Sequence, residues 1–316
     1  MSDDFANDVA DGLGTAPKTL PSKYFYDAAG DDLFIKIMDL PEYYLTRAEM
    51  EIFREQTGAL IKALGQTPKQ PFELIELGAG DGQKTVHLLK GLLSAGYDFT
   101  YVPVDISANV LEHLKKYLAN ELPDLKIRTE QGDYFKRLKV LQETHLPRVI
   151  LYLGSNLGNL TDDKSKAFME KLSRRLMPGD RLILGVDQKK PADIVLPAYN
   201  DSQGVTAAFN LNLLTRINRD LGGEFKLEQF RHAPEYDEEK GVATSYLESL
   251  VDQDVKIRAL DRAFHFTEGE KIKVEISRKY DLPIIRKIIA DTPFEIETVL
   301  KDSQDLYLDI VLLREK

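Results

Sequence analysis

The stretch Ile75-Glu-Leu-Gly-Ala-Gly-Asp-Gly-Gln-Lys-Thr85 decides the fold class of this chain of 316 residues. It overlaps the end of the apolar run Phe72–Leu77, which is typical of a short buried strand, and it precedes Val86–Leu93, where apolar residues recur at helical spacing. A strand, a glycine-rich turn and a helix form an arrangement that cradles nucleotides. Strand-like and helix-like segments alternate from residue 70 to 188. This alternation predicts a Rossmann-like parallel sheet with helices on both faces.

The alternation stops after residue 188 and returns near the end of the chain. A helix is predicted over Val205–Leu221, and the segments after it are β-rich. Past Tyr280 the pattern predicts a helix over Leu282–Ile289 and two terminal strands. We therefore expect two domains. Residues 58–188 with 280–316 form the sheet domain, and residues 1–57 with 189–279 form a second, α+β domain. The β-rich segments are Ser245–Leu250, Val255–Leu260 and Lys271–Ser277, and the terminal strands are Phe294–Leu300 and Leu306–Leu313.

Composition excludes several classes of protein. The net charge of −10 and the absence of a basic stripe argue against a nucleic-acid partner. The chain has no cysteine, so it has neither disulfides nor thiolate metal sites, and its five histidines lack metal-ligand spacing. We expect no metal. The first residues are acidic rather than apolar, and no apolar run is long enough to cross a bilayer. We expect a cytoplasmic protein.

The side chains of the glycine loop indicate which class of ligand it binds. Gln83 stands where a phosphate-binding P-loop has glycine, and it also replaces the third glycine of a dinucleotide fingerprint. The carboxylates of Glu76 and Asp81 would repel a pyrophosphate. A nucleoside ligand with positive charge and no phosphate suits the loop, and S-adenosylmethionine, with a sulfonium and an ammonium, is such a ligand.

The ends of the next strands support that choice. Tyr101–Asp105 ends in a carboxylate that can bind both ribose hydroxyls, and Asp133 with Tyr134 ends the third strand. Asp133 can accept from the adenine amino group, and Tyr134 offers a ring face. Any one of these acids could instead be a helix cap. Three acids at successive strand ends favour a ligand site, because ligands of this fold gather there.

The sequence resembles the histidine-specific, S-adenosylmethionine-dependent N-methyltransferase family over nearly its whole length. The glycine loop alone would not carry this resemblance. The stretches that carry it are Pro21–Phe34, Leu40–Glu49, Leu153–Thr161, Tyr199 with Gly204–Asn210, and Val274–Tyr280.

The resemblance implies a class I methyltransferase sheet joined to a substrate-binding domain. It implies trimethylation of the α-amine of L-histidine to hercynine, the first step of ergothioneine biosynthesis. The partner would be a small amino acid, with no nucleic acid or membrane involved, and we expect a monomer. The cofactor-contacting positions implied by the resemblance are Gly78, Lys84, Asp105, Asp133 and Tyr134.

The resemblance also implies a set of substrate-contacting residues. Asn159 and Tyr199 match the pair that holds the substrate carboxylate, and both can offer neutral donors. Glu275 and Ser277 match the pair that binds the imidazole, and in an extended strand they share one face. Tyr26 is our candidate for hydrogen bonding to the amine and passing its proton to water. Further substrate-contacting positions are Phe34, Tyr43 and Gly154.

Two positions depart from the family pattern. Ser245, or Thr244 if the register slips, stands where the family places a methionine near the imidazole, and Asn156 stands where the bacterial enzymes have threonine. A smaller polar side chain at position 245 would widen or wet the pocket. An N-methyltransferase of the same family that acts on a tryptophan-like or other amino acid is therefore the alternative.

Overall fold

The computed structural model describes residues 3–132 and 145–315. The chain divides into two units, each built from two stretches. We call Met1–Tyr44 with Lys190–Ser277 the α+β unit, and Leu45–Lys189 with Arg278–Lys316 the sheet unit. Residues 45–57, which we expect in the second domain from the sequence, lie in the sheet unit. The predicted domain boundaries stay a prediction.

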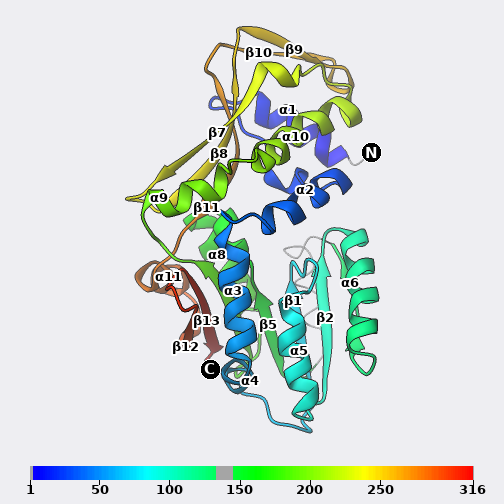
Figure 1. Ribbon diagram of the computed structural model, residues 1–316, viewed down its shortest axis with the longest axis vertical. Coiled ribbons are helices and arrows are strands. Elements are labelled where there is room, and N and C mark those ends of the chain that lie inside the picture. The colour runs from blue at the N-terminus through cyan, green and yellow to red at the C-terminus, as the bar shows by residue number, and fades with distance from the viewer. Residues whose placement is uncertain (1–2, 133–144, 316) are drawn as a thin grey trace. The chain divides into compact units, whose positions relative to one another are not determined.

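The sheet unit is organised around a mostly parallel sheet, which confirms the predicted fold class (Figure 1). Within the described residues its strand order is β12-β13-β6-β5-β1-β2-β3, with β4 also paired to β2. The pairs among β1, β2, β5 and β6 are parallel, and β13 runs antiparallel to β6 and β12. The strands are β1 (Phe72–Leu77), β2 (Phe99–Asp105), β3 (Lys126–Ile127), β4 (Glu130–Gln131), β5 (Arg148–Tyr152), β6 (Arg181–Asp187), β12 (Phe294–Lys301) and β13 (Tyr307–Arg314).

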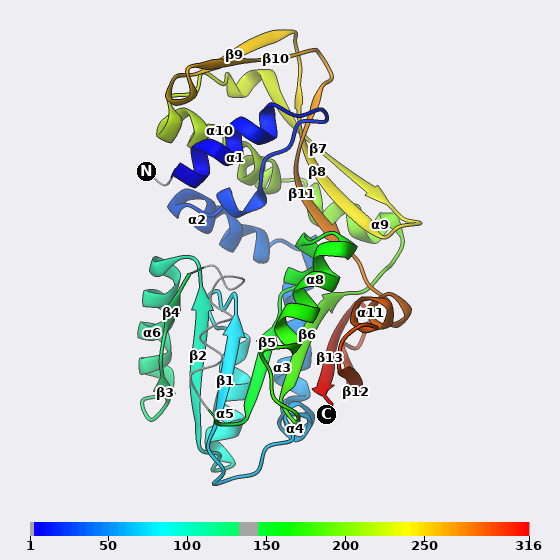
Figure 2. The ribbon, with the colours of Figure 1, turned by 180° about the vertical axis from the view of Figure 1, so that it is seen from behind.

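Helices cover both faces of this sheet. Helices α3 and α5 lie over the face nearest the viewer in Figure 1, and α8 and α11 lie over the opposite face, seen in Figure 2. Central strands covered on both sides are buried along their whole length, and every residue of β1 and of β5 is buried, including the charged Glu73, Glu76 and Arg148. The helices and short helical turns are α3 (Tyr44–Glu55), α4 (Thr57–Ala63), α5 (Thr85–Ser94), α6 (Ala108–Glu121), η3 (Asn156–Asn159), α8 (Asp162–Ser173) and α11 (Leu282–Ile289).

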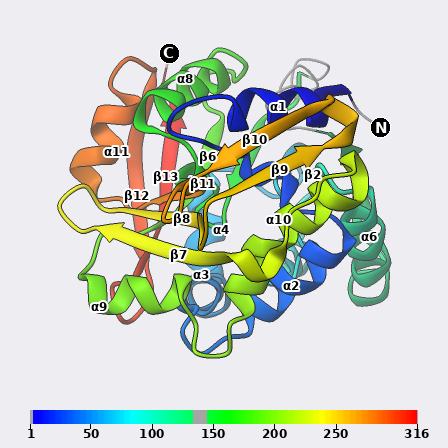
Figure 3. The same ribbon diagram turned by 90° about the horizontal axis from the view of Figure 1, so that it is seen from above.

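The α+β unit has its own core, to which helices and short antiparallel sheets contribute apolar side chains. One sheet has the order β11-β8-β7 and the other pairs β9 with β10. Helices α2 and α10 run beside each other (Figure 3). The elements are α1 (Asp3–Leu13), η1 (Ser22–Tyr24), α2 (Ala28–Met38), α9 (Ala192–Val195), η4 (Leu196–Tyr199), α10 (Val205–Leu221), η5 (Leu227–Gln229), β7 (Phe230–Asp237), β8 (Val242–Ser249), β9 (Gln253–Ile257), η6 (Arg258–Leu260), β10 (Arg262–Phe266) and β11 (Lys271–Arg278).

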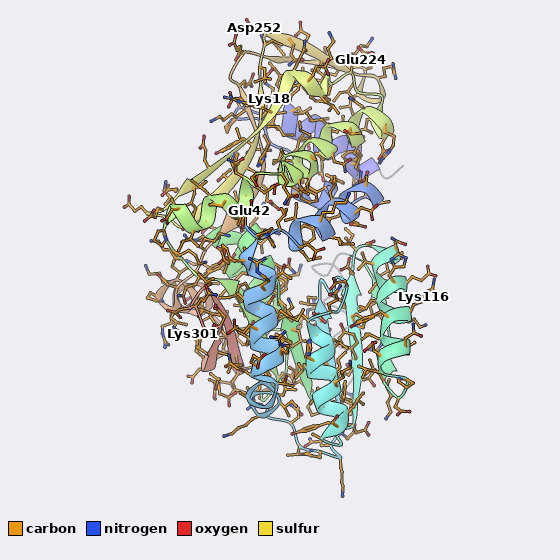
Figure 4. All side chains as sticks on the ribbon, viewed as in Figure 1. Lys18, Glu42, Lys116, Glu224, Asp252 and Lys301 are labelled. Atoms are coloured by element: carbon orange, nitrogen blue, oxygen red, sulfur yellow. The ribbon has the colours of Figure 1, made fainter. Side chains whose placement is uncertain are left out.

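Polar contacts fix the N-terminal segment within the α+β unit. Lys18, labelled in Figure 4, pairs with Glu270, which precedes β11. Glu42, also labelled there, accepts hydrogen bonds from the backbone and hydroxyl of Ser202. The residues on both sides of α2 are therefore tied to segments more than a hundred positions later. Within the described residues, the structure contains no helix that is both long and apolar enough to span a bilayer.

Candidate active site

The glycine loop after β1 meets the turn after β5 at the carboxyl ends of these two strands. Gly78 has a φ of +77°, which favours glycine, and its N–H donates to the Val104 carbonyl at 2.8 Å. A Cβ at position 78 would lie 2.9 Å from the amide nitrogen of Asn156. The chain leaves β1 toward β2 on one side, whereas β5 and β6 lie on the other. This point is the topological switch point of the sheet, where open α/β sheets bind ligands.

Asp105 ends β2 beside this loop. Its carboxylate accepts the N–H of Ser107 at 3.0 Å and the N–H of Gly80 at 3.3 Å. Burial raises the pKa of Asp105, and these backbone hydrogen bonds oppose that effect. The carboxylate is thus held against the glycine loop, as a carboxylate that binds a ribose would have to be. The side chain of Ile106 is about half exposed beside it and offers an apolar surface that we did not predict.

The two acids near the loop have different surroundings. Asp81 is exposed, and its carboxylate accepts the N–H of Gln83 at 3.1 Å. Glu76 is buried and accepts hydrogen bonds from the hydroxyls of Tyr101 at 2.5 Å and Thr85 at 2.8 Å. Burial raises the pKa of Glu76 to about 7. Only Asp81 therefore presents an exposed carboxylate in the loop itself.

The burial of Glu76 predicts a pH-dependent stability. Its folded pKa of about 7 lies above the ordinary 4.5. Between these values the folded chain holds a proton that the unfolded chain has released. Stability therefore falls as the pH rises from 4.5 to 7, by up to about 3 kcal/mol. Glu76→Gln is expected to reduce the fall in the free energy of unfolding by about this amount, as measured by urea unfolding at about pH 5 and about pH 8.

The exposed Glu112 of α6 supplies a matched control for that measurement. It pairs with Lys116, labelled in Figure 4, on the surface of the same unit. Glu112→Gln should keep the pH dependence of the wild-type protein, because an exposed carboxylate carries no burial penalty. If the stability of the Glu76→Gln variant falls with rising pH as much as that of the wild type, Glu76 is not the source of this pH dependence.

Lys84, at the start of α5, does not point freely from the loop. Its ammonium forms an ion pair with Glu49 of α3, whose side chain is 1% exposed. Burial lowers the pKa of Lys84, but the Glu49 carboxylate more than offsets this, so the pKa lies above its ordinary value. Glu49 also accepts the N–H of Gly154, at 3.0 Å to each oxygen. Glu49 lies 35 positions before Lys84 and was not among the predicted site residues.

The remaining predicted residues of the sheet unit lie in or after the turn that follows β5, or outside the described residues. Gly154 and Asn159 lie on the turn after β5 and at the end of η3, and both are exposed. Asn156 lies on the same turn, against Gly78. Asp133 and Tyr134 fall outside the described residues. Their predicted contacts with adenine stay predictions.

In the α+β unit, three predicted aromatic residues belong to one cluster. The ring of Tyr26 packs edge-on against Phe34 and Phe209, with centroids 5.7 and 5.8 Å away. Phe34 packs edge-on against Tyr43, with centroids 6.4 Å apart. All three predicted residues are partly buried against the core. Phe209, from α10, completes the cluster and was not among the predicted site residues. Such ring faces can hold a cation.

A second group of polar residues centres on Tyr199. Its hydroxyl donates to the Ser277 hydroxyl at 2.8 Å, and its backbone carbonyl lies 2.9 Å from Nε2 of His232. Burial lowers the pKa of His232, so the ring is neutral near pH 7 and Nε2 can donate to that carbonyl. The sequence did not single out His232. The structure thus brings Tyr199 and Ser277 together, 78 positions apart.

The positions of Ser245 and Glu275 follow from their strands. Ser245 is buried in β8, two residues from Leu247, which pairs with His232 in β7. Side chains two residues apart share a face, so Ser245 lies on the face of His232, and Thr244 lies on the other. Glu275 is partly exposed in β11, two residues from Ser277. The extended conformation on which we based the Glu275 and Ser277 pair is present.

Comparison with known proteins places similar sequences among S-adenosylmethionine-dependent N-methyltransferases. The family model described as histidine-specific, S-adenosylmethionine-dependent methyltransferase matches residues 5–314. The histidine N-alpha-methyltransferase of Mycolicibacterium smegmatis is 38% identical over 86% of this chain and 83% of its own length. That of Mycobacterium tuberculosis is 37% identical, again over 86% and 83%. The 4-dimethylallyltryptophan N-methyltransferase of Claviceps fusiformis is 28% identical over 71% of this chain and 64% of its own length.

Proposed function

Since this chain belongs to the histidine-specific, S-adenosylmethionine-dependent methyltransferase family, we propose that it methylates the α-amine of L-histidine three times and releases hercynine. The observation that carries this proposal is the match of the family model to residues 5–314, together with two histidine N-alpha-methyltransferases at 37–38% identity. Hercynine is then the product that leads to ergothioneine.

The sheet unit supplies residues suited to S-adenosylmethionine. Gly78 lets the backbone approach the ligand closely, and Asp105 binds both ribose hydroxyls. This assignment is supported by the backbone N–H groups that hold Asp105 against the loop. Asp133 and Tyr134 would complete the adenine site. The bound sulfonium supplies an activated methyl group, so the protein needs no further electrophilic catalyst.

The substrate nitrogen attacks the methyl carbon in line with the departing sulfur. Alignment of two bound reactants can lower the barrier by about 7–11 kcal/mol in favourable cases. The amine must be neutral to attack, and an ordinary α-amino pKa of about 8 requires only a modest shift. Tyr26 hydrogen-bonds to the amine and helps its proton to reach water. An ordinary tyrosine pKa of about 10 makes it a relay rather than a strong base.

Separate groups recognise the two ends of histidine. Asn159 and Tyr199 donate to its carboxylate, and Glu275 with Ser277 binds the two nitrogens of its imidazole. The Tyr199 hydroxyl donates to Ser277 at 2.8 Å, so it exchanges this hydrogen bond for one to the carboxylate when histidine binds. The Ser277 hydroxyl can donate to a ring nitrogen. Phe34, Tyr43 and the backbone at Gly154 complete the contacts. The aromatic faces around Tyr26 accommodate the permanent charge of the methylated amine.

A second candidate substrate is a tryptophan-like amino acid. It is favoured by the small Ser245 in place of methionine and by the similarity to a dimethylallyltryptophan enzyme. A carboxylate at position 275 favours imidazole, which presents N–H donors at both edges when protonated. The pattern of acids and hydroxyls thus supports histidine over an indole.

The proposal is tested by incubating the protein with S-adenosylmethionine and one amino acid at a time. The masses of the products are then measured. The expected product is histidine carrying three added methyl groups. Histidine left unchanged while tryptophan or another amino acid gains methyl groups would refute histidine as the substrate and retain the enzyme class. Accumulation of the singly methylated product would refute the number of methyl transfers but keep histidine as the substrate.

A further inference from the structure

The turn after β5 and the start of α5 share one buried anchor, the carboxylate of Glu49. Its side chain is 1% exposed, and it projects from α3 in the sheet unit. It pairs with the ammonium of Lys84 and accepts the N–H of Gly154 at 3.0 Å. These two partners belong to the segments that follow β1 and β5, the strands on either side of the switch point. A shift of Glu49 would therefore move both segments.

Two further polar groups, Asp309 and Tyr307 of β13, lie around the same carboxylate. A Cβ built on Gly185 would overlap a Glu49 oxygen and would lie 3.0 Å from an Asp309 oxygen and 3.1 Å from the Tyr307 hydroxyl. Only a glycine in β6 leaves room for these three oxygens. Both residues of β13 are fully buried.

The protonation of these neighbours follows from their surroundings. Burial, and after it the charge of Glu49, raises the pKa of Asp309 and that of Tyr307 well above their ordinary values. Among the residues that the structure describes, neither the Asp309 carboxyl nor the Tyr307 hydroxyl has a hydrogen-bond partner. A neutral Asp309 and a neutral Tyr307 can each donate a proton toward Glu49.

We propose that Glu49 is a positioning residue for methyl transfer: its buried carboxylate fixes Lys84 and the Gly154 turn. The inference rests on the proposed function, which assigns the segments after β1 and β5 to the ligand site. It extends that function because Glu49 acts without touching either reactant. Its effect passes through the backbone of the turn and through Lys84.

The variant Glu49→Gln tests this inference, because it keeps the side-chain size and removes the charge. Its affinity for S-adenosylhomocysteine, measured by calorimetry, should fall about 10- to 100-fold, the range expected for the loss of a charge-assisted hydrogen bond. Glu73→Gln is the matched control, because Glu73 is also a buried carboxylate of the sheet unit in an ion pair, with Arg128, but lies near the start of β1, away from the glycine loop. Its affinity for S-adenosylhomocysteine should stay within about threefold of the wild type. Urea unfolding of each variant reports stability separately.

Three outcomes would overturn the inference. One is a folded Glu49→Gln protein that binds S-adenosylhomocysteine as the wild type does. Another is an equal loss in Glu73→Gln, which would make the effect a general consequence of removing a buried charge from the sheet unit. Hydrogen exchange of the Gly154 amide in the wild type needs no variant: slow exchange is expected, and exchange at the rate of a free peptide would also overturn it. A wild type that binds no S-adenosylmethionine would instead refute the proposed function.

Discussion

Asp105→Asn is expected to weaken S-adenosylmethionine binding about 100-fold. The carboxylate accepts from two ribose hydroxyls in the proposed complex, and a hydrogen bond to a charged acceptor is worth about 1.5–3 kcal/mol. The amide offers one oxygen acceptor and places a donor group against the loop. Calorimetric titration with S-adenosylmethionine measures the effect directly. Histidine binding to the variant should change far less.

Asp98 provides the control for this substitution. It directly precedes β2, at the opposite end of the strand from Asp105, and pairs with Lys126 in an exposed ion pair. Asp98→Asn should bind S-adenosylmethionine as the wild type does, because an exposed pair contributes little to stability. Ser107, whose hydroxyl accepts the N–H of Val110, keeps the start of α6 capped in both variants. Equal affinity of Asp105→Asn and wild type would remove Asp105 from the ribose site.

Glu275→Ala is expected to raise the KM for histidine about 10- to 100-fold, with S-adenosylmethionine affinity preserved. The imidazole would lose a charged acceptor, and Ser277 alone cannot replace it. Steady-state kinetics with histidine, together with calorimetry for the cofactor, separates the two effects. A loss of cofactor binding in step with histidine would indicate a folding defect rather than a specificity residue.

Glu235 of β7 is the matched control for Glu275. It also projects from a strand of the β11-β8-β7 sheet, and it forms an exposed ion pair with Lys271. Glu235→Ala should leave the histidine KM unchanged. If Glu275→Ala behaves in the same way, Glu275 is an ordinary exposed strand acid and has no role in recognition of the imidazole.

Local signals in the sequence predicted several elements with the bounds that the structure shows. Helix α11 spans Leu282–Ile289 as predicted, because Asp281 caps it and a proline follows in its first turn. Helix α10 also has its predicted bounds, with Gly222 in the left-handed conformation after its last residue. Strands β7 and β10 were not predicted. β7 contains Pro234 and several charged residues, so its sequence alone does not indicate a strand, and its pairing with β8 stabilises it.

The sequence by itself determined the α/β class, the switch-point loop and the family, because each depends on residues close together along the chain or on whole motifs. Only the tertiary structure decided which partners the buried polar groups contact. Glu49 meets Lys84 across 35 positions and Gly154 across 105, and His232 meets Tyr199 across 33. Contacts at such separations leave no periodic pattern in the sequence. Burial lowers the pKa of His232, since the surrounding protein replaces the water that would otherwise stabilise the charged ring.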